Sequence, residues 1–168
     1  GFKKFRPVCY LTDEWGCPDQ QPVLGIPFYL ADPNLRKLES AVDQLEDERQ
    51  IMMYMRHEAG HVFNYAYRLY TTPEWRRLFG PFFRAYRDDY RPVPFSRNYV
   101  RHIEGWYAQK HPDEDFAETF AVWLTPGIPL GCSMRARAAL RRRAAPPGQE
   151  WGRVVHLGAP GRVRAGRP

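Results

Sequence analysis

Two histidines four residues apart, with a glutamate directly after the first, form the most distinctive chemical pattern in the sequence. They are His57, Glu58 and His61. On a helix, side chains four positions apart lie on one face, so both imidazoles can bind one metal ion. Glu58 would then lie beside the metal, where it could take a proton from water. The pattern predicts a catalytic metal centre; the alternatives are a metal site without catalysis and two structural histidines in a core.

A zinc ion needs a third protein ligand if one coordination position is to stay open for water. The candidates are His102 and His111, or the carboxylates Glu114 and Glu118. The two glutamates are four positions apart, so one could bind metal while the other accepts the ring N–H of a ligand histidine. Apolar neighbours predict that this face is buried, and a cation would offset the cost of burying two carboxylates. Either glutamate could be the ligand on these physical grounds.

Two neighbouring features are interpreted more simply. Asp113 and Asp115 are expected to complement the dipole at the start of the helix that carries Glu114. His102 is a single loop histidine next to Arg101, and we expect it to be exposed to solvent.

Helical patterns position the two motifs. Apolar residues recur at helical spacing from Ile51 to Leu69, which places His57 and His61 on one helix that ends near Tyr70. A second helix begins near Pro112 or Asp113 and stops at residues 125–127. The segment 88–111 between them has no clear period, so we predict a long surface loop there, and long ordered loops are often functional.

The N-terminal half predicts further elements. Residues 1–22 read as irregular, and residues 23–31 read as a strand at the edge of a sheet, because Pro27 cannot donate to a ladder. Asp32 and Pro33 predict the start of a helix with apolar residues through Leu45, either separate from the 51–70 helix or joined to it by a kink. A short helix from Thr72 is broken at residues 80–81.

The net charge of +6 is unevenly distributed over the 168 residues. Residues 132–168 hold nine arginines and one acidic residue, whereas residues 1–131 carry a net charge of −2. The composition, with 43% hydrophobic residues, is sufficient for one domain, which we place at 1–131. The Arg-rich end at 132–168 is predicted to be disordered. Nucleic-acid binding is therefore not expected of the folded part, although the basic end could contact phosphates.

The cysteines and the hydropathy pattern set further limits. Cys9, Cys17 and Cys132 form no C-x-x-C pair and are odd in number. A Cys9–Cys17 disulfide would leave one cysteine over, so we expect buried thiols, and we slightly favour a cytoplasmic location. No apolar run approaches the roughly 18–20 residues that span a bilayer, so we expect no membrane segment. Because the sequence begins with Gly1, we expect a fragment or a trimmed chain.

These motifs together resemble those of known metallopeptidases. A helix with HExxH, followed by a helix with Glu-x-x-x-Glu, resembles the gluzincins. The string EDFAETFA at 114–121, with Tyr107 seven residues before Glu114, resembles their lethal-factor-like branch. More closely, the sequence from Trp15 to Gly127 resembles the bacterial family of putative zinc-binding metallopeptidases. The resemblance covers most of residues 5–127, and the N-terminal zinc ribbon of typical members is missing here.

The resemblance implies a zincin-like, α-rich α+β domain that hydrolyses peptide bonds in a peptide or protein substrate with one Zn²⁺. It implies roles for six residues: His57, His61 and Glu114 as zinc ligands, Glu58 as general base, Glu118 as the partner of a ligand histidine, and Tyr107 as the oxyanion stabiliser. If residues 23–31 form an edge strand, an extended substrate could add to it.

Two alternatives to this interpretation stay open. One is a catalytically silent zinc-binding module with a basic end that contacts nucleic acid. The other is a zinc enzyme whose third ligand is His102 or His111.

Overall fold

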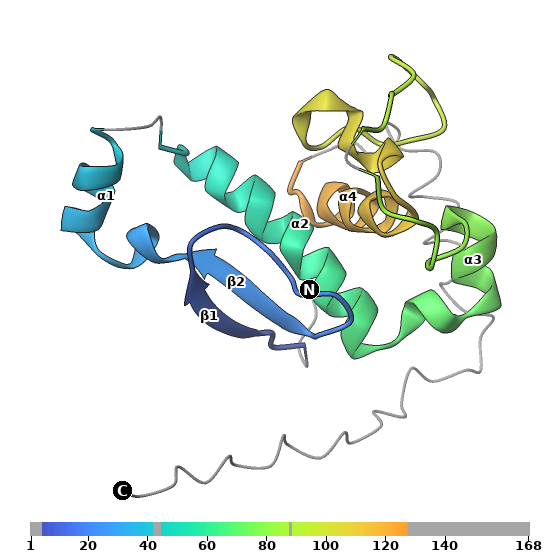
Figure 1. The fold of residues 1–168 in the computed structure, drawn as a ribbon, viewed down its shortest axis with the longest axis horizontal. Helices are drawn as coiled ribbons and strands as arrows, with labels where there is room; N and C mark the ends of the chain where they lie inside the picture. Colours follow the sequence, from blue (N-terminus) through green and yellow to red (C-terminus); the bar gives the residue numbers. More distant parts are fainter. Residues whose placement is uncertain (1–4, 42–44, 88, 128–168) are drawn as a thin grey trace, which may run out of the picture.

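The structure is a computed structural model that describes residues 5–41, 45–87 and 89–127 (Figure 1). Helices dominate it, with one small sheet, which confirms the prediction of an α-rich α+β fold. The elements in chain order are β1 (Val8–Thr12), β2 (Val23–Pro27), η1 (Phe28–Ala31), α1 (Pro33–Glu39), α2 (Glu48–Ala66), η2 (Leu69–Thr71), α3 (Pro73–Phe79), η3 (Glu104–Gln109) and α4 (Pro112–Leu124). The predicted disordered end at 132–168 and Cys132 lie outside the described residues, so the domain boundary near 131 stays a prediction.

Helix α2 carries the HExxH motif, and local sequence signals define its ends. Asp47 caps its start in a capping box, in which the Asp47 side chain accepts from the Gln50 amide and Gln50 bonds back to the Asp47 amide. The helix ends before Arg68, which adopts the left-handed conformation at φ 49°. Helices α1 and α2 are separate, and α1 ends at Glu39 instead of reaching Leu45. The two-helix alternative is therefore confirmed, with a shorter first helix than predicted.

Helix α4 carries the candidate carboxylates and begins where the sequence predicts. His111 caps its start with a ring nitrogen that accepts from the Asp113 amide, and Pro112 fills the first helical position. The helix ends at Leu124, just before the predicted stop. Every residue from 112 to 121 is buried, so the helix runs through the interior of the molecule.

The two site helices lie side by side at the centre of the molecule (Figure 1). They approach each other tightly where Gly60 of α2 faces Ala117 of α4. A Cβ atom built on Gly60 would lie 2.8 Å from the Ala117 Cα and 3.1 Å from its carbonyl oxygen. Only glycine allows this approach, because any side chain would collide with backbone. An aromatic-rich core supports the pair from one end and consists of Tyr65, Leu69, Trp75, Phe82, Phe116 and Phe120.

The sheet differs from the prediction in two ways. The N-terminal segment is not wholly irregular, because residues 8–12 form β1 and pair in parallel with β2, from Val8 opposite Val23 to Thr12 opposite Pro27. Strand β2 ends at Pro27, and the rest of the predicted 23–31 strand is η1. Gly16 forms an antiparallel bridge to Gly25 on the side of β2 away from β1. Strand β2 therefore lacks the free edge at Gly25 that strand addition by a substrate would need.

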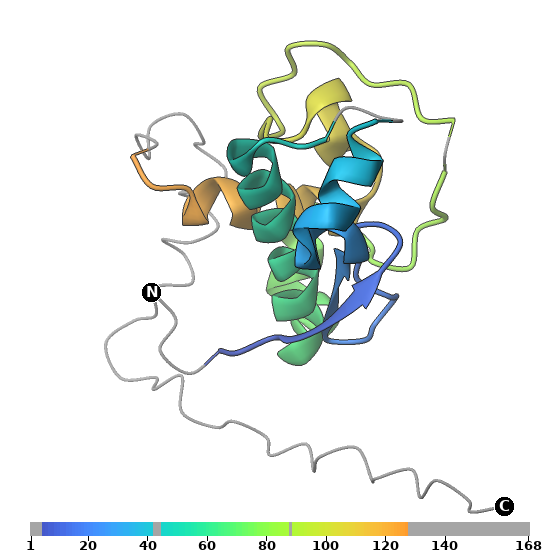
Figure 2. The same ribbon diagram turned by 90° about the vertical axis from the view of Figure 1, so that its left-hand side faces the viewer.

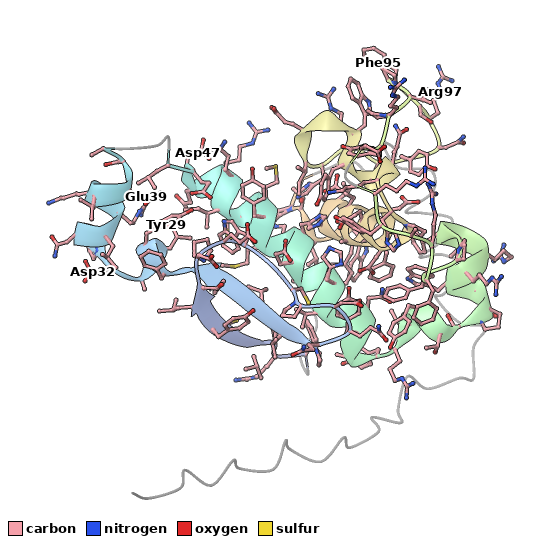
Figure 3. All side chains as sticks on the ribbon, in the orientation of Figure 1. Tyr29, Asp32, Glu39, Asp47, Phe95 and Arg97 are labelled. Carbon is pink, nitrogen blue, oxygen red and sulfur yellow. The ribbon has the colours of Figure 1, made fainter. Side chains whose placement is uncertain are left out.

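The segment between α3 and α4 is largely irregular, as predicted, but it contains η3. Figure 2 shows it running along one side of the molecule, and in Figure 3 Phe95 and Arg97 lie at its outer end. Within η3, Gly105 and Trp106 have positive φ angles of 74° and 55°, so the chain kinks before Tyr107. No described helix is long and apolar enough to cross a membrane.

The described cysteines are both free thiols, but they differ in environment. Cys9 is exposed, so the expectation of buried thiols is wrong for this residue. Cys17 is half-buried beside the site helices, and burial raises its pKa to about 12.

We expect the substitution Gly60→Ala to lower the free energy of unfolding by about 1–3 kcal/mol, because the new methyl group would force α2 and α4 apart. Urea unfolding of the purified protein would measure this loss. Gly16→Ala is the matched control, since a Cβ there meets nothing within 4 Å. If Gly60→Ala were instead more stable by about 1 kcal/mol, helix propensity alone would govern the position and the close approach would be wrong.

Candidate metal centre

Three side-chain atoms converge where α2 passes α4. The Nε2 atoms of His57 and His61 lie 3.1 Å apart. Oε2 of Glu114 lies 3.0 Å from the first and 3.3 Å from the second. All three residues are buried, and they form a group that could hold a metal ion.

The opposite side of each imidazole contacts a second carboxylate. His57 Nδ1 lies 3.0 Å from Glu118 Oε1, and His61 Nδ1 lies 2.8 Å from Asp113 Oδ2. An ionised carboxylate only accepts hydrogen bonds, so a neutral ring that donates to this second carboxylate carries its hydrogen on Nδ1. Each neutral ring then directs the lone pair of Nε2 toward Glu114.

This donor set fits a zinc ion. Two lone pairs and a carboxylate oxygen face one another, and in the neutral form of the rings there is no hydrogen between them to relieve the repulsion. Ligand atoms at about 2.0–2.1 Å from a tetrahedral zinc lie about 3.4 Å from one another. The observed separations of 3.0–3.3 Å are close to that value. Two histidines and one carboxylate leave a fourth tetrahedral position for water.

The electrostatics of the centre favour positive charge. Burial opposes protonation of His57, but hydrogen bonds to Glu114 and Glu118 outweigh it and raise the pKa of His57. The pKa of His61 is also raised against burial, mainly by the charges of Asp113 and Glu114. Burial opposes ionisation of Glu114, yet the adjacent histidines lower its pKa well below the usual value.

Asp113 takes a role that the sequence interpretation missed. Its Oδ2 accepts from His61 and from the Tyr65 hydroxyl, and its Oδ1 accepts from the Asn64 amide at 2.7 Å. The interpretation of Asp113 as a charge for the helix dipole is therefore incomplete. The sequence did contain a clue to this role of Asp113. If two histidines bind the metal, each needs an acceptor that orients its ring, and Asp113 is next to Glu114 in the sequence.

The two glutamates of α4 occupy different positions. Glu118 is 0% exposed, and both oxygens of its carboxylate accept hydrogen bonds. Oε1 accepts from His57, while Oε2 accepts from the backbone amides of His102 and Ile103, both at 2.9 Å. Glu118 therefore lies behind His57, whereas Glu114 lies in front of both rings.

The two alternative histidine ligands are engaged elsewhere. The His102 ring lies 3.1 Å from the Met53 carbonyl oxygen, so it is half-buried and the expectation of solvent exposure is wrong. His111 Nε2 donates to the Arg84 carbonyl oxygen at 2.8 Å, and its Nδ1 accepts from the Asp113 amide. Neither histidine belongs to the convergent group found among the described residues.

A cavity of about 930 Å³ opens onto the centre, and both Glu58 and Tyr107 line it. Burial raises the pKa of Glu58. The Tyr107 ring centroid lies 5.7 Å from that of His57, and burial raises the pKa of the Tyr107 hydroxyl.

Tyr86 is a further residue at the centre, and the sequence analysis did not single it out. Its hydroxyl donates to Glu114 Oε1 at 2.8 Å and lies 3.2 Å from the Tyr107 hydroxyl.

Comparison with protein families agrees with this geometry. Residues 21–127, more than half of the chain, match a family described as "Putative zinc-binding metallo-peptidase". Comparisons with curated proteins and with solved structures gave no significant match.

We expect Asp113→Asn and Glu118→Gln each to weaken zinc binding by about 10- to 100-fold, because each removes the acceptor that fixes a ligand imidazole. Competition with a chromogenic chelator would measure the affinity. Glu74→Gln, on the exposed first turn of α3, should bind zinc like the unmodified protein. Equal affinity in all three variants would show that the two carboxylates do not orient the ligands.

Proposed function

This chain is a member of the putative zinc-binding metallo-peptidase family, and we propose that it hydrolyses peptide bonds with one Zn²⁺, in the manner of a gluzincin. His57, His61 and Glu114 would hold the ion. When bound, Zn²⁺ supplies Lewis-acid chemistry, polarising a carbonyl group and making a water molecule more acidic. One observation carries the proposal: three convergent donor atoms lie at the wall of a cavity that Glu58 also lines.

Glu58 is the proposed general base. It directly follows His57 on α2, so its side chain lines the cavity beside the ligand histidines. Its carboxylate would accept a proton from the attacking water and return it to the leaving amine. A catalytically silent zinc module would not require a half-buried carboxylate at this place, because burying one costs free energy.

Tyr107 is the proposed donor to the developing oxyanion. Its hydroxyl reaches the cavity beside the His57 ring, from a loop that Glu118 fastens through the amides of His102 and Ile103. A phenol is a suitable donor because its hydroxyl can be aimed at the oxygen that gains charge in the transition state. Tyr86 would act as a positioning residue through its hydrogen bond to Glu114.

We expect Glu58→Gln to keep stoichiometric zinc but to lose hydrolysis by about 10²- to 10⁴-fold, because the amide cannot accept the proton. A fluorogenic casein assay, with zinc measured by atomic emission, would test both parts. Unreduced hydrolysis in this variant would refute the assigned base, and loss of zinc would show that Glu58 supports the centre itself.

We expect Tyr107→Phe to reduce kcat by about 10²- to 10³-fold while changing KM little, because the hydroxyl would act only in the transition state. Steady-state kinetics on a single peptide would separate the two constants. Tyr99→Phe, which removes a hydroxyl from the same long loop outside the cavity wall, is the control. A rise in KM with unchanged kcat would instead assign Tyr107 to substrate binding.

A further inference from the structure

The cavity extends along α2 from the metal centre toward the start of the helix. At this end it is lined by Trp15, Glu46 and Tyr54. Tyr54 is four residues before Glu58, so it lies one turn away on the same face of α2. One turn rises about 5.4 Å, and an extended peptide advances about 3.3–3.6 Å per residue. Tyr54 is therefore within reach of side chains close to a bond held at Glu58, and the same cavity continues to Glu46.

Glu46 contributes a fixed negative charge to this end. Its Oε1 accepts from Trp15 Nε1 at 3.2 Å, and its carboxylate accepts from the Tyr29 hydroxyl at 2.9–3.0 Å. Figure 3 shows Tyr29 on η1 and Asp47 at the start of α2, on the same side of the molecule. Both donors are neutral, so they orient the carboxylate without cancelling its charge. An ionised carboxylate offers about four lone-pair sites, which leaves room for further donors.

No basic side chain neutralises Glu46 within the described part of the chain, where every ion pair found involves His57 or His61. Glu46 is half-buried, and it lines the cavity instead of pointing into bulk solvent. A carboxylate in such a place is most stable when a positive group approaches it.

Two aromatic rings line the same end of the cavity as the Glu46 carboxylate. The centroids of Trp15 and Tyr54 are 6.3 Å apart, with an angle of 31° between the ring planes. Aromatic faces attract guanidinium and ammonium groups, and a carboxylate binds them by charge-assisted hydrogen bonds. An acidic substrate side chain would be repelled here, and an apolar one would bury the Glu46 charge without compensation.

We propose that Glu46, Trp15 and Tyr54 form a substrate subsite for a positively charged side chain, arginine or lysine, on the Tyr54 side of the cleaved bond. The inference rests on the proposed peptidase function. Glu46 determines specificity in this subsite, and Trp15 and Tyr54 form its walls. The competing explanation is structural, since the carboxylate also joins the 14–17 segment and η1 to the start of α2.

The variant Glu46→Gln separates these two roles, because the amide oxygen can still accept from Trp15 and Tyr29 while the charge is lost. The full zinc-loaded chain would first digest a peptide library, and mass spectrometry would define the cleavage sites. Matched peptides with arginine or its neutral analogue citrulline at successive positions on each side of the cleaved bond would then be compared. We expect kcat/KM to favour arginine by about 10- to 100-fold, and this ratio to fall to about 1 in Glu46→Gln.

Glu48→Gln is the matched control, because it removes the same charge two residues away from an exposed position on the first turn of α2. It should keep the arginine preference. Hydrolysis without a preference for basic side chains, or a preference that persists in Glu46→Gln, would overturn the subsite and leave the peptidase function intact.

A binding measurement separates failure of the subsite from failure of the proposed function. Fluorescently labelled arginine and citrulline peptides would be titrated into the Glu58→Gln protein, with and without Glu46→Gln. If no peptide is hydrolysed by the unmodified chain but the arginine peptide binds at least 10-fold more tightly in a Glu46-dependent way, the subsite stands and the peptidase function fails. The subsite is wrong if neither cleavage nor binding depends on the charge.

Discussion

The close approach of α2 and α4 at Gly60 and Ala117 is the constraint on which the centre depends. The carboxylates that contact the imidazoles all come from α4, and a carboxylate has a short reach. Because glycine allows the two backbones to approach this closely, Glu114 can meet both rings from the front while Glu118 holds His57 from behind. A wider spacing would leave buried charges without partners. The small residue inside the HExxH motif is therefore part of the site geometry, although it contributes no functional group.

The arrangement also explains how one helix can bury so many acidic groups. Asp113 accepts from three side chains, and Glu118 accepts from one imidazole and two backbone amides, so neither leaves an unsatisfied oxygen. Glu114 differs, because one of its oxygens faces two nitrogen lone pairs once the rings are neutral. Of these three carboxylates, only Glu114 directs an oxygen at the point where a cation would bind. This asymmetry distinguishes a metal centre from a hydrogen-bonded core of the same composition.

The sequence allowed the two site helices to be predicted because their signals are local. Caps, apolar periodicity and the four-residue spacing of like side chains depend only on neighbouring residues, and they located α2 and α4 closely. The role of Asp113 was missed because a local explanation, the helix dipole, was sufficient for an aspartate in a first turn. Tyr86 and β1 were missed because their partners are distant in the sequence: Tyr86 reaches Glu114 from an irregular loop, and β1 depends on pairing with β2. The sequence likewise left open which of Glu114 and Glu118 would face the metal site, because this depends on the side of His57 on which each carboxylate lies.

Glu118 has a consequence beyond orienting one imidazole. The same carboxylate fixes the backbone at His102 and Ile103, just before the turn that presents Tyr107. Metal binding at the centre and ordering of the loop at residues 102–103 are therefore linked equilibria, because Glu118 contacts both His57 and the loop. Thermodynamic reciprocity then requires that a bound molecule which immobilises the loop through this side chain, and binds more tightly when the ion is present, also raises the affinity of the centre for the ion. The affinity for the metal would accordingly be highest while such a molecule is bound.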